Sequence, residues 1–190
     1  MIYLKYSGSI ESKKATAQLI DEFVDISRIS GWEYSIISEN FQTMTAGSGL
    51  PDNDNLGNQD DNDDSGIQTL SSSEVYLEGI VIHIRRDADP VRLTFDKNGR
   101  LATISFSSTD TPGFNKKLTV KKYEFIYYPF IKLLTRDADY HAQAVKLLDY
   151  VKKKYIFDLE VMDPSYYWET RDVEQLKVKL WKASLKQSII

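Results

Sequence analysis

Cysteine is absent from this chain of 190 residues, which excludes disulfide bonds, thiolate catalysis and cysteine-based zinc sites. Histidine is scarce, with two residues, His83 and His141. No apolar run approaches the roughly 20 residues that a membrane-spanning helix needs. The first residues lead into a strand-like segment without the pattern of a signal peptide. Composition therefore predicts a cytoplasmic protein that makes no contact with a membrane.

The chain also has no excess of basic residues over acidic ones. The chain has 24 Lys and Arg against 28 Asp and Glu, for a net charge of −4. Six of the Asp fall in one stretch, Pro51–Gly66, which has no basic residue and a single apolar side chain, Leu56. Without that stretch the remainder carries about +2, too little for the basic surface that phosphate groups require. The charge pattern therefore excludes nucleic acid as a partner.

The acidic stretch lies within a longer segment, residues 43–73, which has neither helical nor strand periodicity. A run of like charges with few apolar side chains cannot bury enough surface to offset the entropy lost on ordering. We therefore expect this segment to be a disordered or mobile acidic insertion. A contact surface for a basic partner is the alternative to a solvated loop.

Two Asp spacings in this segment resemble a calcium-binding loop, one starting at Asp52 and the other at Asp61. In the first, Leu56 stands where an oxygen ligand is needed. In the second, the last ligand position falls on Ser72, which cannot close the site. Neither spacing is flanked by predicted helices, so we expect no metal site.

Outside the insertion, strand-like and helix-like segments alternate. A helical stripe of apolar side chains predicts a first helix over 9–30, closed by Gly31. A second helix begins at Asp137 or Asp139 and a last one at Asp172, with Leu176, Leu180 and Trp181 facing inward. The strands are expected at 2–6, 32–41, 75–86, 91–95, 101–107, 118–128 and 157–162.

This order, β-α-β-β-β-β-β-α-β-α, has its strands in the middle and helices towards each end. Such an order favours an α+β fold. We expect a two-layer domain with an antiparallel sheet of about five to six strands and helices packed on one face. The length suits a single domain over residues 1–190 that includes the acidic insertion.

Three consecutive aromatic residues, Tyr166, Tyr167 and Trp168, form the best candidate site, with Asp163 and Glu169 on either side. A carboxylate beside such rings can have its pKa raised by desolvation and act as an acid. The rings themselves can line a groove for a ligand or partner. The alternative is structural: the rings cover the edge of the core and Glu169 bonds to the start of a helix.

His141 is the other candidate, because it follows Asp137 by one helical turn. An Asp–His pair at this spacing can orient an imidazole for general-base catalysis. The same spacing describes an exposed ion pair at the start of a helix. No Gly-x-Ser-x-Gly, His-x-x-x-His or cysteine nucleophile accompanies His83 or His141. A structural role is therefore favoured for both.

These observations favour a non-enzymatic binding protein, without cofactor or metal, that buries its aromatic side chains against another protein or a small molecule. The acidic insertion would speed encounter with a basic partner. The alternative is a small-ligand-binding protein or a modest hydrolase-like enzyme. Its pocket would lie between the sheet and the helix of His141, with His141, Glu169 and a nearby Tyr as acid–base groups. A domain that holds a homodimer together is the third possibility.

Overall fold

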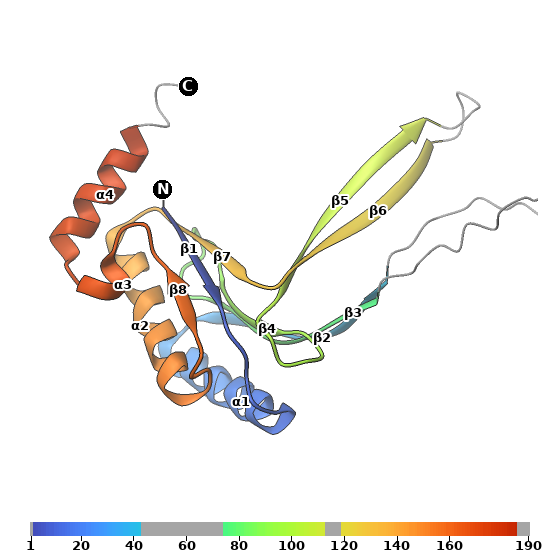
Figure 1. Ribbon diagram of the computed structural model, residues 1–190, viewed down its shortest axis with the longest axis horizontal. Helices are drawn as coiled ribbons and strands as arrows, with labels where there is room; N and C mark the ends of the chain where they lie inside the picture. The colour runs from blue at the N-terminus through green and yellow to red at the C-terminus, as the bar shows by residue number, and fades with distance from the viewer. Residues whose placement is uncertain (1, 43–73, 113–118, 186–190) are drawn as a thin grey trace, which may run out of the picture. The chain divides into compact units, whose positions relative to one another are not determined.

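The computed structural model describes residues 2–42, 74–112 and 119–185 (Figure 1). The acidic insertion predicted at residues 43–73, with its two calcium-like spacings, lies outside the described residues. Backbone contacts divide the chain into two units. The first unit comprises Met1–Phe41, Val75–Ile104 and Tyr127–Ile190, and the second comprises Gln42–Glu74 and Ser105–Ile126. That the whole chain forms one domain stays a prediction.

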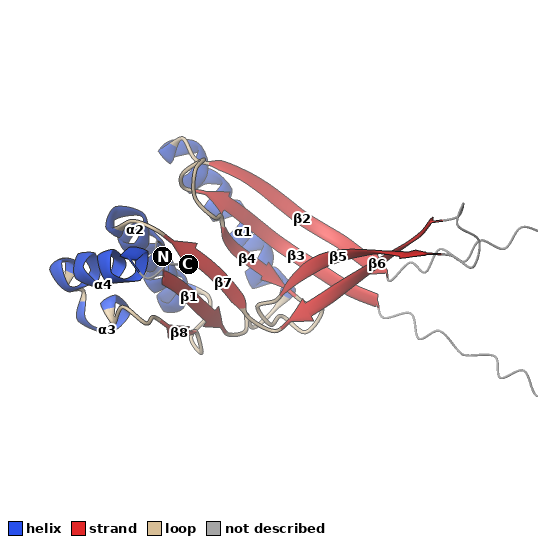
Figure 2. Ribbon diagram, turned by 90° about the horizontal axis from the view of Figure 1, so that it is seen from above, coloured by secondary structure: helices blue, strands red, loops and turns tan. Residues whose placement is uncertain are grey.

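The first unit contains all the helices of the described residues and two antiparallel sheets, so the α+β fold class is confirmed (Figure 2). One sheet has the order β7-β1-β8 and the other β2-β3-β4. Its elements are β1 (Ile2–Ser7), α1 (Lys13–Ser30), β2 (Glu33–Gln42), β3 (Glu74–His83), β4 (Val91–Phe95), β7 (Ile131–Thr135), α2 (Ala138–Lys154), β8 (Glu160–Met162), α3 (Tyr167–Thr170) and α4 (Val173–Leu185).

The second unit contains most of a two-stranded sheet made of β5 (Thr103–Pro112) and β6 (Thr119–Tyr128). The described residues thus form eight strands in three small sheets. A single sheet of about five to six strands was the wrong expectation, because a linear sequence does not reveal which strands pair. None of the helices in the described residues is long and apolar enough to cross a membrane.

The core of the first unit follows the two periodicities of the sequence. Alternate residues of β1 are buried, and the hydroxyl of Tyr6 donates to the carbonyl of Arg92 at 2.8 Å, which ties β1 to β4. Apolar stripes of α1 and α2 complete the core. The buried residues on these two helices include Leu19, Ile20, Phe23, Val24, Tyr140, Ala144, Leu147, Leu148 and Val151.

The first helix begins later than predicted. Ser12, not Ser9, caps α1 by accepting a hydrogen bond from the backbone N–H of Ala15 at 3.2 Å. Ser9 is held elsewhere, since its hydroxyl donates to Asp158 at 2.5 Å. The end is as predicted: Gly31 closes α1 with a φ of 68°, in the left-handed region.

The Asp96–Gly99 turn is present, with Gly99 at a φ of 76°. The hairpin it closes is shorter than predicted, because only Phe95 and Leu101 form a bridge before the chain enters β5 at Thr103. β5 then pairs with β6. The strand β7 was missed altogether, although Ile131, Leu133 and Thr135 alternate in the way that a strand requires.

The last strand and helix also differ from expectation. β8 covers only Glu160–Met162, since Phe157 lies exposed in a turn. Asp172 caps α4 as predicted, accepting from the backbone N–H of Gln175 at 3.0 Å. Leu176 and Leu180 are buried as predicted, but Trp181 is 61% exposed. The inward orientation of Trp181 was therefore wrong.

Candidate functional site

The structure brings two predicted site residues, His141 and Asp163, together in a fully buried cluster. Nε2 of His141 lies 3.1 Å from Oδ2 of Asp163. On the other side of the ring, Nδ1 lies 2.8 Å from Oγ1 of Thr135, whose hydroxyl donates to the carbonyl of Ile2. The imidazole of His141, on α2, therefore connects β7 to the turn after β8.

Asp163 is the centre of this cluster. Its carboxylate accepts from the hydroxyl of Ser165 at 2.7 Å and from the backbone N–H groups of Ser165 and Trp168, both at 2.9 Å. Burial alone would raise the pKa of Asp163, but the hydrogen bonds from His141 and Ser165 outweigh it and lower the pKa to about 2. A general acid needs a raised pKa, so Asp163, which is ionised at neutral pH, is not suited to that role.

The side chains of Ser165, His141 and Asp163 have the composition of a catalytic triad but not its arrangement. In a triad the serine and the carboxylate face opposite ring nitrogens. Here Ser165 Oγ and Asp163 Oδ2 both face Nε2, at 3.4 and 3.1 Å. Ser165 is fully buried, and its hydroxyl donates its hydrogen bond to Asp163. The cluster fixes the chain in place and offers no nucleophile to a substrate.

The proposed pairing of Asp137 with His141 does not occur. Asp137 caps α2 by accepting from the backbone N–H of Tyr140 at 2.8 Å, and it forms an ion pair with Arg85 at 2.7 Å. The ring of His141 turns instead to Thr135, Asp163 and Ser165. The second histidine, His83, is half-buried at the end of β3.

The three consecutive aromatic residues go to three different environments. Tyr167 is buried, and its ring meets that of His141 edge-on, with centroids 5.7 Å apart. Trp168 is half-buried, with the guanidinium of Arg171 4.8 Å from its ring. Tyr166 is 56% exposed. Tyr166 precedes α3 with a left-handed φ of 65°, and Tyr167 and Trp168 point about 100° apart within the helix, so the three rings do not face the same partner.

The surface of this region is therefore formed by Tyr166, Trp168 and Glu169, while Asp163 and His141 lie beneath it. The ammonium group of Lys179 on α4 lies 5.1 Å from the ring centroid of Tyr166. The predicted site residues thus divide into an exposed group and a buried group that holds the turn.

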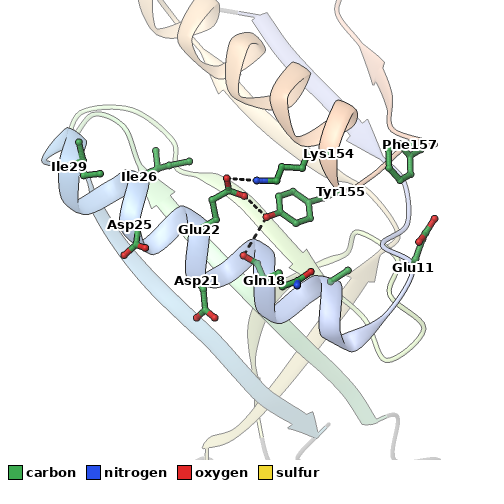
Figure 3. A pocket seen from close by; sticks show the side chains of 11 residues that line it. Glu11, Gln18, Asp21, Glu22, Asp25, Ile26, Ile29, Lys154, Tyr155 and Phe157 are labelled. Atoms are coloured by element: carbon green, nitrogen blue, oxygen red, sulfur yellow. Dashed lines mark hydrogen bonds and ion pairs between the residues drawn. The ribbon is translucent and has the colours of Figure 1, made fainter.

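A second feature was not predicted: a groove of about 790 Å³ along α1, closed by the end of α2 and the residues after it (Figure 3). Four acidic side chains and one basic side chain line it. The acidic residues are Glu11, Asp21, Glu22 and Asp25, and the basic one is Lys154.

Among the described residues, Lys154 is the one cation that lines the groove, and it pairs with Glu22. Glu22 accepts from Lys154 at 2.5 Å and from the hydroxyls of Tyr150 and Tyr155. Burial opposes the charge of Glu22, yet these hydrogen bonds lower its pKa, and that of Lys154 is raised in turn. Asp25 has only an exposed contact with Arg28 at 3.6 Å.

Exposed apolar side chains mark the two ends of the groove. Ile29 is 88% exposed at one end and Phe157 is 64% exposed at the other, and Figure 3 shows the acidic residues of α1 between them. Ile26 and the aromatic stem of Tyr155 extend the apolar lining. The groove thus combines negative charge with apolar surface.

The sequence contained a signal for this groove. Asp21 and Asp25 lie one helical turn apart on the outer face of α1, and Ile29 continues the same direction. Phe157, however, is distant in the sequence, and no local pattern places it beside α1.

Within the described residues, no three His, Cys, Asp or Glu side chains are grouped so that they could hold a metal ion. Comparison with known proteins gives no match to the chain, whether to a family model, to a curated protein or to a solved structure. The two features that can indicate a function are therefore the region of residues 163–169 and the groove along α1.

Proposed function

We propose that this chain is a non-enzymatic binding protein whose groove along α1 takes a basic, amphipathic segment of a partner protein. One observation carries the proposal. The groove joins Glu11, Asp21 and Asp25, which have no paired cation among the described residues that line it, to the exposed side chains of Ile29 and Phe157. Apolar surface of this kind, bordered by charge, is typical of a partner-binding surface.

The two parts of the groove would contribute differently. Covering Ile29 and Phe157 would stabilise a complex by about 1.5–3 kcal/mol for each side chain that becomes fully buried. The carboxylates of Asp21 and Asp25 are exposed, so pairing them with lysine or arginine adds little affinity. They would instead speed association and reject acidic partners, and both effects weaken with salt.

The surface predicted at residues 163–169 remains part of the proposal as a second contact. Its support is the exposed ring of Tyr166, which lies beside Lys179 on α4. Asp163 and His141 would act there by holding the turn in shape rather than by touching the partner.

We also infer the two-layer arrangement expected from the sequence, with the helices of the first unit on one side of its sheets. The alternation in β1 supports it, because Leu4 and Tyr6 are buried in the core while Tyr3 on the opposite face is exposed.

The hydrolase-like alternative depended on His141 as a base. Both nitrogens of its ring have side-chain partners, and the residue has no exposed surface. A substrate would have to displace Thr135 or Asp163 to reach the ring, so we do not propose catalysis.

A fluorescently labelled synthetic peptide tests the proposed function. We suggest an amphipathic helix of leucine and lysine, about 18 residues long, titrated with the full chain and followed by fluorescence anisotropy. The variant Asp21→Lys/Asp25→Lys is expected to bind it at least about tenfold more weakly than the native chain.

The matched control is Glu39→Lys/Glu160→Lys, which makes the same change in net charge at two exposed positions outside the groove. It is expected to bind within about twofold of the native chain. Equal losses in both variants, or no binding by the native chain, would contradict the proposed function.

A further inference from the structure

The helix α4 has two apolar faces. Leu176 and Leu180 are buried, and α4 packs through them against α2 and α3. At about 100° per residue, Val178, Trp181 and Leu185 lie together on the opposite side of the helix. All three are exposed, with Trp181 at 61%. A helix that packs by one face normally has a polar outer face, so this second stripe is apolar surface that the described residues leave exposed.

Positive charge borders the outer stripe. Lys177 and Lys182 lie on either side of Val178, Trp181 and Leu185 on the helical wheel. Lys177 has one exposed ion pair, with Glu174 at 2.8 Å. Glu174 also lies on this outer face, whereas Lys179 lies off it, beside the ring of Tyr166, so the outer face carries two Lys and one Glu and has a small positive charge.

We propose that the outer face of α4 docks in the acidic groove of a second copy of this chain. The inference rests on the proposed function, since it names the segment that the groove takes. The two surfaces are complementary in both respects: Lys177 and Lys182 would face Asp21 and Asp25, and Trp181 would cover apolar lining of the groove. Trp is among the residue types enriched where an interface gains most of its binding energy.

The dimensions are compatible. The part of α1 that lines the groove, from Ala15 to Ile29, is about 21 Å long at 1.5 Å per residue. The helix α4, Val173–Leu185, is about 18 Å long by the same measure. A helix of this length can lie along the whole groove.

The contact joins two different surfaces, so it is head-to-tail. The copy that docks its α4 still has an empty groove. The copy whose groove is filled still has an undocked α4. Such an interface forms chains or rings that grow with concentration, whereas two like faces form a closed dimer. This difference makes the proposal testable with two complementary variants of the full chain.

The first variant, Asp21→Lys/Asp25→Lys, disables the groove and leaves α4 intact. The second, Trp181→Ala/Lys182→Glu, disables the outer face of α4 and leaves the groove intact. Sedimentation velocity is expected to show association of the native chain that increases with concentration and decreases with salt. Each variant alone is expected to be monomeric, and an equimolar mixture is expected to give a species of twice the monomer mass and nothing larger.

Three results would overturn the inference: a native chain that is monomeric at the highest concentration reached, a variant that associates alone, or a mixture that stays monomeric. Circular dichroism checks that both variants are folded. A leucine–lysine peptide separates the two proposals. If the peptide binds the groove while the native chain stays monomeric, the further inference fails and the proposed function stands. If the peptide does not bind, the proposed function fails.

Discussion

Nε2 of His141 lies 3.1 Å from Oδ2 of Asp163, and both side chains are completely buried. This pair joins α2 to the turn that leads into α3, at the base of the exposed ring of Tyr166. A buried carboxylate that accepts this many hydrogen bonds stabilises the fold mainly because, without it, the buried donors would have no acceptor.

Asp163→Asn should lower the free energy of unfolding by about 3 kcal/mol. The substitution keeps the shape but removes the charge that faces His141 and two backbone N–H groups. Urea denaturation measures the change. Glu160→Gln, close by in the sequence but exposed, is the control and should stay within about 0.5 kcal/mol of the native chain. Equal effects would mean that the buried pair does not stabilise the fold.

The same pair predicts a dependence on pH. Folding lowers the pKa of Asp163 from 3.8 to about 2. Between these values the unfolded chain binds a proton that the folded chain does not, so this contribution is complete above the unfolded pKa and is lost as the pH falls through the folded one. The amount is about 2 kcal/mol.

Unfolding of the native chain and of Asp163→Asn should therefore be compared from about pH 5 down to about pH 2. The difference between their free energies of unfolding is expected to shrink as the pH falls. A constant difference across this range would contradict the account.

Gly79 and Gly31 both have a positive φ, but only at Gly79 would a Cβ collide with a neighbouring strand. A Cβ at Gly79 would lie 2.1 Å from the carbonyl oxygen of Leu93 on β4, so Gly79→Ala should destabilise the fold by about 3 kcal/mol. Gly31 also has a positive φ, but a Cβ there would have no neighbour within 4 Å. Gly31→Ala should therefore cost only about 1 kcal/mol, from its left-handed backbone. Thermal unfolding of both variants tests the ranking.

Truncation of a side chain should lower the free energy of unfolding on the buried face of α4 but not on its outer face. Leu180→Ala removes a buried side chain and should cost about 2–4 kcal/mol. Trp181→Ala removes a larger but exposed one and should leave the stability of the monomer within about 0.5 kcal/mol. A large loss at Trp181 in dilute solution would show that its ring packs on its own chain.

Local features of the fold were predictable where one segment decides them. Gly31 ends α1 and Asp137 caps α2 because each acts on neighbouring backbone groups. Trp181 was misplaced because a helix with apolar residues on both faces gives two readings of the same period. β7 was missed because it is a strand of only five residues that begins soon after Pro129.

The candidate sites were harder to predict because their parts come from distant segments. His141 finds its carboxylate in Asp163, on a different element, whereas spacing within the helix suggested Asp137. The groove needs Phe157 beside α1, and no local pattern brings them together.

The most direct test of the groove is an exchange of charge. A helical peptide of leucine and glutamate, matched in length to the leucine–lysine peptide, should not bind the native chain but should bind Asp21→Lys/Asp25→Lys. Anisotropy titrations of both peptides with both proteins are expected to show this reversal, with each matched pair at least about tenfold tighter than each mismatched pair. If the lysine peptide binds both proteins equally and the glutamate peptide binds neither, the groove along α1 is not the recognition surface.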